Sequence, residues 1–384
     1  MSAASDKARF YLEQSVPELK EFEKKGIFTA EEITSITRKR SDFEHKINAR
    51  GSTPADFARY AEFEINVDAL RRKRVKRLGI KATNHTGKRR IFFVFDRATR
   101  KHAGDVDLWM LAIDFARKQK AYKKLQEMLT NVLRLHPTKS ALWIYAAQVA
   151  VEDNGDMAEA RSYMQRGLRF CKNVKNMWLQ YARLEMSYIA KIHARREMLG
   201  ITDQENHKDT QPLDTAIAPT VTDTDIVPQA DRHQIDTAAL KTLEQTPVKS
   251  GAIPMAIFDS AMTQFQDPDL ALDFFEMVSD YDQTPTSRIV AAHIEEKLAG
   301  EFPQSWQGQA CRIRAPVVAL DKSDPEFPVA LRQSITRLRE ARGNPSSRKL
   351  DLNIRTWLEN LKKDEPEMDE SIRIVMDSVL KSLQ

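Results

Sequence analysis

The chain has 384 residues, of which 41% are hydrophobic, and its 60 lysines and arginines against 55 aspartates and glutamates leave a formal net charge of +5. Two distant cysteines, Cys171 and Cys311, exclude a disulfide framework or a cysteine zinc site and fit thiols in a reducing compartment. The polar N-terminus predicts no secretory leader. No apolar run approaches the roughly 18 residues that a membrane span requires, so we expect no membrane partner.

The first fifty residues have the pattern of two or three helices. Pro17 suits the first turn of a helix that ends before Gly26. Thr29 and Glu32 match a capping box, which predicts that a longer helix begins there and runs to about Ala49.

The next helix is predicted to begin with Thr53 as its cap and Pro54 in its first turn. Its C-terminal half opens the densest charge feature of the chain, because residues 69–95 hold ten basic side chains and no acidic one. These candidate RNA-binding or nuclear-import residues, called the basic run below, are Arg71, Arg72, Lys73, Arg74, Lys76, Arg77, Lys81, Lys88, Arg89 and Arg90.

Three interpretations of the basic run stay open. It fits a solvated helix end, since a helix C-terminus favours cations. It also fits a nuclear-import signal or a patch that binds phosphates. The nearby Phe92, Phe93 and Phe95 have helical spacing and are expected in the core. Any RNA contact would therefore address the RNA backbone and carry little sequence information.

Two apolar series in the middle of the chain share one period. Trp109, Trp143 and Trp178 recur in similar settings at steps of 34 and 35 residues. A second series precedes them with the same steps and consists of Phe95, Leu129 and Met164. A period near 34 with two helices per repeat is typical of helix–turn–helix solenoids.

Within one repeat, the segments 107–117 and 122–135 each place their apolar residues on one helical stripe. A single helix pair cannot cover these stripes, whereas stacked pairs bury them against one another. The sequence therefore predicts an all-α fold, a superhelical solenoid of helix pairs. The side chains expected to pack in these repeats include Phe57, Tyr60, Trp109, Trp143, Trp178 and Tyr181.

The composition changes after the third repeat of the tryptophan series. Residues 199–250 are rich in threonine, aspartate and glutamine and have no aromatic residue, which predicts a disordered acidic linker with one short helix near 235–244. Helical patterning then returns, except between Phe302 and Asp324, where prolines predict an irregular stretch. Trp306 and Trp357 are expected in the core.

Four regions follow from these patterns. They are an N-terminal helical region (1–52), a repeat array (53–198), a disordered acidic linker (199–250) and a C-terminal repeat-like helical region (251–384).

Short motifs narrow the repeat type. Val94–Ala98 and Ile257–Ala261 resemble the second helix of half-a-TPR (HAT) repeats, which are typical of RNA-processing assemblies. An aromatic residue, a tyrosine and a glutamate recur with one spacing on two first helices, at Phe57, Tyr60 and Glu64 and again at Trp178, Tyr181 and Glu185. Ala116 and Ala150 replace the glutamate in the two middle repeats.

A further set of segments carries a more specific resemblance. In chain order they are Glu18–Glu23, Gly26–Phe28, Ser41–Ile47, Tyr60–Asn66, Ala141–Ile144 and Arg183–Met186. Their order and spacing resemble the U3 small nucleolar RNA-associated protein 6 family. The match is specific up to about Ala190 and loose from Ile253 onward.

The resemblance implies a nucleolar HAT-repeat scaffold in the UTP-B subcomplex of the small-subunit processome. Its implied partners are β-propeller proteins of UTP-B, within the particle of U3 snoRNA and the 5′ external transcribed spacer of pre-rRNA. Such a subunit would support pre-rRNA processing and 40S ribosome biogenesis. The alternatives are a protein that binds RNA directly through the basic run, and a HAT scaffold of another RNA-processing machine.

Motifs that carry catalysis are missing from the sequence. It contains no phosphate-loop, dinucleotide-binding, zinc-protease or nucleophile-elbow motif. We therefore predict no enzymatic activity, no catalytic residue, no cofactor, no bound metal and no small-molecule substrate.

Overall fold

The computed structural model describes residues 2–80, 86–198, 250–281, 284–320, 324–341, 347–364 and 370–383. All regular secondary structure in these ranges is helical, which confirms the predicted all-α helical-repeat class. The chain divides into two compact units, Met1–Pro137 and Thr138–Gln384. The predicted linker, with its short helix, lies outside the described residues apart from Ser250.

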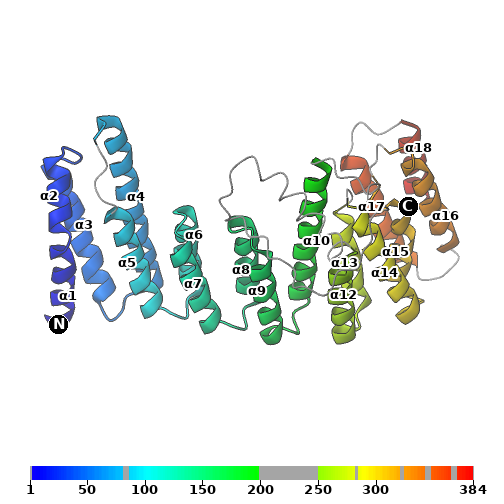
Figure 1. Cartoon of the computed structure of the whole chain (residues 1–384), viewed down its shortest axis with the longest axis horizontal. Helices are drawn as coiled ribbons and strands as arrows, with labels where there is room; N and C mark the ends of the chain where they lie inside the picture. The colour runs from blue at the N-terminus through cyan, green and yellow to red at the C-terminus, as the bar shows by residue number, and fades with distance from the viewer. Residues whose placement is uncertain are drawn as a thin grey trace, which may run out of the picture. The chain divides into compact units, whose positions relative to one another are not determined.

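The first unit is built from helices that pack against their neighbours along the chain (Figure 1). α1 and α2 both lie against α3, α4 packs on α5, and α6 packs on α7. The bounds are α1 (Ser2–Glu13), α2 (Val16–Lys24), α3 (Ala30–Asn48), α4 (Pro54–Leu78), α5 (Thr86–Lys101), α6 (Val106–Lys118) and α7 (Tyr122–Leu135).

Capping interactions determine where the two long helices of this unit begin. The Thr29 hydroxyl accepts a hydrogen bond from the Glu32 N–H at 3.3 Å, and Glu32 Oε2 accepts one from the Thr29 N–H at 3.0 Å. Before α4, Asp56 Oδ2 accepts from the N–H and the hydroxyl of Thr53, at 2.9 and 2.8 Å. Gly79 ends α4 at a φ of +64°, which glycine adopts without strain. The predicted starts of α3 and α4 are confirmed.

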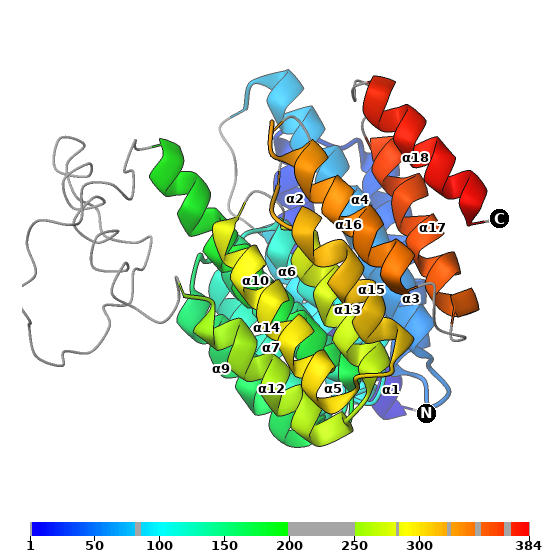
Figure 2. The same cartoon turned by 90° about the vertical axis from the view of Figure 1, so that its right-hand side faces the viewer.

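The second unit continues the pairing of helices. α8 packs on α9, α10 on α12, α13 on α14, and α15 on α16. α17 lies beside α18, as Figure 2 shows. The bounds are α8 (Ser140–Asp153), α9 (Met157–Phe170), α10 (Lys175–Met198), α12 (Ala252–Phe265), α13 (Pro268–Ser279), α14 (Pro285–Glu301), α15 (Trp306–Arg314), the 3₁₀ helix η2 (Ala315–Val317), α16 (Phe327–Ala341), α17 (Ser347–Asp364) and α18 (Glu370–Ser382). Because α10 packs directly on α12, residues 199–249 connect the two helices of one pair.

The irregular stretch predicted between Phe302 and Asp324 is wrong in its first half, because α15 lies there. Ser305 caps this helix, since its hydroxyl accepts a hydrogen bond from the Gly308 N–H at 3.1 Å. The helix buries Cys311 completely. The prolines of this stretch flank α15 and do not interrupt it.

The tryptophans of the repeat series are held by their indole N–H groups as well as by packing. Trp109 and Trp143 are buried and Trp178 is half-buried. The Nε1 atom of Trp109 donates to the Ala103 carbonyl at 3.1 Å, and that of Trp178 donates to the Lys172 carbonyl at 2.9 Å. Each acceptor lies six residues before its tryptophan, so the indole fixes the turn that precedes its helix.

The phenylalanines that follow the basic run differ in their burial. Phe95 is buried as expected, whereas Phe93 is 38% exposed, which corrects its expected place in the core. The Phe93 ring contacts Tyr11 of α1 edge-on, at 5.1 Å between centroids, and the Arg97 guanidinium lies 4.5 Å from its centroid. Its partners are therefore side chains of the first unit itself.

Candidate interaction surfaces

A buried ion-pair framework holds α3, α4 and α5 together. The guanidinium of Arg40 on α3 donates from Nε and Nη2 to the two carboxylate oxygens of Glu64 on α4, at 2.7 and 2.8 Å. Both side chains are only 2% exposed. One helical turn further along α3, the Glu44 carboxylate accepts from Arg97 on α5 at 2.7 and 2.8 Å and from the Tyr60 hydroxyl at 3.0 Å. Burial, followed by the charges of Glu64 and Glu44, raises the pKa of Tyr60 and keeps its hydroxyl protonated.

The same arrangement recurs in the second unit. Arg161 on α9 donates from Nε and Nη2 to both carboxylate oxygens of Glu185 on α10, at 2.7 and 2.8 Å. The arginine lies 24 residues before the glutamate, as Arg40 does before Glu64. The repeated glutamates of the sequence are therefore buried partners of an arginine on the preceding helix.

The two middle repeats lack both members of this pair. Where alanine replaces the glutamate, at Ala116 and Ala150, the corresponding position on the preceding helix is Phe92 or Gln126. The ring of Phe92 lies edge-on to Phe115, at 5.1 Å between centroids. In these four helix pairs the acid and the base are thus present together or absent together.

Four of the ten side chains in the basic run are used inside the first unit. Arg71 donates from Nε and Nη2 to Asp68 Oδ1 at 3.0 and 2.8 Å, and Arg72 pairs with the same carboxylate. Arg74 bridges to α3 and its preceding turn by donating to both Glu32 oxygens at 2.6 Å and to the Ile27 carbonyl at 3.0 Å. The fourth, Arg90 on α5, donates to Glu18 on α2 at 3.0 Å.

Four other cations of the basic run are exposed, three on the last turns of α4 and one near the start of α5. Lys73, Lys76, Arg77 and Arg89 are exposed and pair with no acid in the part of the chain that the structure describes. We call these four exposed cations the basic surface. Gly87 brings the start of α5 against α4, because a Cβ there would overlap the Asp68 carboxylate. Lys88 beside the basic surface is half-buried, and Lys81 lies outside the described residues.

Groups suited to catalysis or metal binding do not come together among the described residues. They contain no set of three or more His, Cys, Asp or Glu side chains that could hold a metal ion, and no helix among them is apolar enough over a sufficient length to cross a membrane. Cys171 and Cys311 are free and buried. Burial raises the pKa of the Cys311 thiol to about 12 and also raises that of Cys171, so neither is a reactive thiolate.

Comparison with known proteins shows which family the sequence is similar to. Residues 12–98 match the family model described as U3 small nucleolar RNA-associated protein 6. The chain is 38% identical over 199 residues to U3 small nucleolar RNA-associated protein 6 of Schizosaccharomyces pombe, covering 51% of this chain and 41% of that protein. Over about half of its length the chain is therefore similar to the U3 small nucleolar RNA-associated protein 6 family. The predicted resemblance is thereby confirmed.

Other members of the family agree with this match. The human homologue is 33% identical over 190 residues, covering 48% of this chain and 32% of the homologue, and the Dictyostelium discoideum homologue is 29% identical over 187 residues, covering 48% and 31%. The chain therefore spans well under half of the length of the curated relatives that it matches.

The family segment and the ion-pair framework coincide. Residues 12–98 run from the end of α1 to near the end of α5. They include the pair Arg40–Glu64, the carboxylate of Glu44 and its partner Arg97. The matched segment therefore contains the contacts that fix α3, α4 and α5 to one another.

Acid is expected to weaken the first unit through Glu32. Hydrogen bonds from Arg74 and then from the Thr29 N–H lower the pKa of Glu32 from its usual 4.5 to about 2. Its carboxylate thus stabilises the folded state above pH 4.5, and this contribution is lost as the pH falls from 4.5 towards 2. We predict that Glu32→Gln lowers the urea midpoint at neutral pH and that its difference from wild type shrinks as pH falls. A difference that grows in acid would contradict the assignment.

Proposed function

We propose that the chain is a non-catalytic scaffold subunit of the small-subunit processome, within the UTP-B subcomplex in the nucleolus. It would support U3-dependent pre-rRNA processing and 40S ribosome biogenesis through contacts with β-propeller proteins of UTP-B. The observation that carries the proposal is the match of residues 12–98, together with relatives whose names associate them with U3 small nucleolar RNA. The stacked helix pairs support it, because such arrays offer extended surfaces for partner proteins.

Affinity purification tests this proposal. The tagged chain, expressed in the cells it comes from, should co-purify UTP-B proteins and U3 snoRNA, measured by mass spectrometry and quantitative reverse transcription. The matched control is the tagged Arg40→Leu, Glu64→Leu double variant. It replaces the ion pair at the centre of the family segment with an apolar contact and should co-purify the same partners. If neither UTP-B proteins nor U3 snoRNA rise above an untagged control, the proposal is wrong.

A second candidate function is direct RNA binding, and the basic surface favours it. Four exposed cations at one end of a helix pair can neutralise phosphates without displacing an internal ion pair. Changing the whole basic run would not test this function, because Arg71 and Arg74 hold the first unit together. Any loss of RNA binding in such a variant would be confounded by a loss of folding.

A test that avoids this loss of folding changes only the four residues of the basic surface. Replacing Lys73, Lys76, Arg77 and Arg89 with glutamate should leave the circular dichroism spectrum unchanged and weaken binding to single-stranded RNA. The salt slope of the affinity should fall by about 3, since each phosphate contact contributes roughly 0.7. The control changes four exposed lysines elsewhere in the same unit, Lys20, Lys24, Lys118 and Lys123. If both variants lose RNA binding equally, the basic surface is not a specific site.

A further inference from the structure

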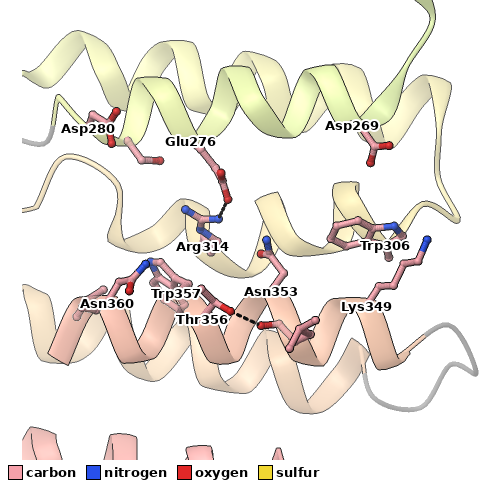
Figure 3. Close-up of a pocket in the computed structure, with 13 residues that line it drawn as sticks. Asp269, Glu276, Asp280, Trp306, Arg314, Lys349, Asn353, Thr356, Trp357 and Asn360 are labelled. Atoms are coloured by element: carbon pink, nitrogen blue, oxygen red, sulfur yellow. Dashed lines mark hydrogen bonds and ion pairs between the residues drawn. The ribbon is translucent and has the colours of Figure 1, made fainter. Parts of the chain in front are cut away.

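The second unit contains an open groove of about 970 Å³ that none of the contacts described so far uses. Figure 3 shows α13 and α17 as its two walls, with the short helix α15 between them. α15 packs on both walls and has only nine residues, so the longer flanking helices extend beyond it. Trp306 and Trp357 line the groove and are half-buried, which corrects the expectation that both lie in the core.

The α13 wall is acidic. Asp269, Asp273, Glu276 and Asp280 recur at the spacing of one helical face, and Asp269, Glu276 and Asp280 line the groove. Asp269 accepts a hydrogen bond from Gln307 at 2.6 Å, and Glu276 accepts one from Arg314 at 2.7 Å. Asp273 and Asp280 are both exposed, and Asp280 Oδ2 lies 3.6 Å from Arg183 Nη2 on α10. This wall therefore attracts cations and repels phosphates.

The opposite wall and the floor present amides and aromatic rings, together with the cations of Lys349 on α17 and Arg314 on α15. Asn353, Trp357 and Asn360 occupy one face of α17, as their labels in Figure 3 show. Two buried polar atoms in the groove have no hydrogen-bond partner within the described residues, the Oδ1 of Asn353 and the Nε of Arg314. Buried polar atoms are nearly always satisfied in proteins, so these two call for a partner.

We propose that the groove between α13 and α17 binds an extended, lysine- or arginine-rich segment of a partner protein. A peptide backbone supplies an N–H for the acceptor on Asn353 and a carbonyl for the donor on Arg314. Lysine stems and charges suit the face of Trp306 and the acids of α13. The Trp357 ring already faces the Arg314 guanidinium, at 5.8 Å from its centroid. This inference rests on the proposed scaffold function and names the surface and partner class that would serve it.

The groove has room for a short segment. From Asp269 to Asp280, α13 rises about 17 Å at roughly 1.5 Å per residue. An extended peptide covers that length with about five residues. A segment of this length with lysine at alternate positions directs every lysine to the same side, which matches an acidic wall on one side of the groove.

Fluorescence anisotropy with the full chain tests the proposal. The probe is a fluorescein-labelled Gly-Lys-Val-Lys-Val-Lys-Gly peptide, and the comparison peptide carries glutamate in place of lysine. We expect the lysine peptide to bind at least about tenfold more tightly than the glutamate peptide. Asn353→Leu and Asp280→Lys should each weaken lysine-peptide binding by about tenfold, through a lost hydrogen bond and a reversed charge.

Glu296→Lys provides the matched control, because Glu296 is an exposed acid on α14 that does not line the groove. Lysine at the end of α13 is compatible with the helix dipole, so Asp280→Lys should fold, which circular dichroism checks. Equal binding of both peptides, or an equal loss in Glu296→Lys, overturns the proposal, as does groove-dependent binding of poly-uridine RNA. Any of these results would leave co-purification with UTP-B proteins intact, so failure of the groove is distinct from failure of the scaffold function.

Discussion

Replacing Glu64 with alanine is expected to lower the free energy of unfolding by roughly 3–5 kcal/mol, because the guanidinium of Arg40 is then buried without its carboxylate. Arg40 is 2% exposed and cannot reach water without separating α3 from α4. Burial lowers the pKa of Arg40, but Glu64 more than offsets this and holds the guanidinium charged. The measurement is urea unfolding followed by circular dichroism.

The chain itself suggests the compensating change. The next helix pair along the chain places Phe92 and Ala116 where Arg40 and Glu64 would stand. The double variant Arg40→Phe, Glu64→Ala should therefore be clearly more stable than Glu64→Ala alone, because no buried charge is left unpaired. If the double variant is no more stable than the single variant, the ion pair is not what makes Glu64 necessary.

Trp143→Ala is expected to lower the free energy of unfolding by roughly 3–5 kcal/mol, because it leaves a cavity in the core. Trp143 on α8 is buried, and its ring stacks on Phe170 of α9 at 6.0 Å between centroids. Gly167 allows α9 to approach, because a Cβ there would lie 2.8 Å from Trp143 Cγ and would overlap the terminal carbon of Met177. Differential scanning calorimetry of the variant measures the effect.

The sign of the stability change on replacing Gly167 checks the close contact between α8 and α9. Alanine normally stabilises a helix relative to glycine by about 1 kcal/mol, yet Gly167→Ala should destabilise the protein because its methyl group has no space. A Cβ at Gly300 on α14 would meet no atom within 4 Å, so Gly300→Ala should be neutral or stabilising. Stabilisation by Gly167→Ala would show that α8 and α9 are not packed as closely as described.

The repeat period could be read from the sequence because the helices are local and their apolar residues are regularly spaced. Thr29 and Thr53 predicted two helix starts correctly, since capping depends on residues only three positions apart. The sequence pattern shows Glu64 and Glu185 as a repeated feature, but it does not by itself identify their arginine partners. Aligning the preceding helices in the same register would have revealed them, since each arginine lies 24 residues before its glutamate.

Other features depended on contacts that the period does not encode. The prolines around α15 predicted an irregular stretch, whereas Ser305 starts a helix between them. The pairing of α10 with α12 was hidden because residues 199–249 interrupt the period. The groove combines side chains from α13, α15 and α17, so no local pattern identifies it. Four cations of the basic run are held by acids. Arg71 and Arg72 pair with Asp68 on their own helix, whereas the partners of Arg74 and Arg90 lie on other helices, where no local pattern shows them.

We propose that this chain assembles through protein contacts, and ribonuclease treatment of the affinity-purified complex tests this proposal most directly. The measured quantity is the amount of each UTP-B protein retained on the tagged chain after U3 snoRNA has been digested and washed away. Retention of these proteins at the level of the untreated sample is the predicted result. Their loss together with the RNA would contradict the account and make RNA the link between this chain and the particle.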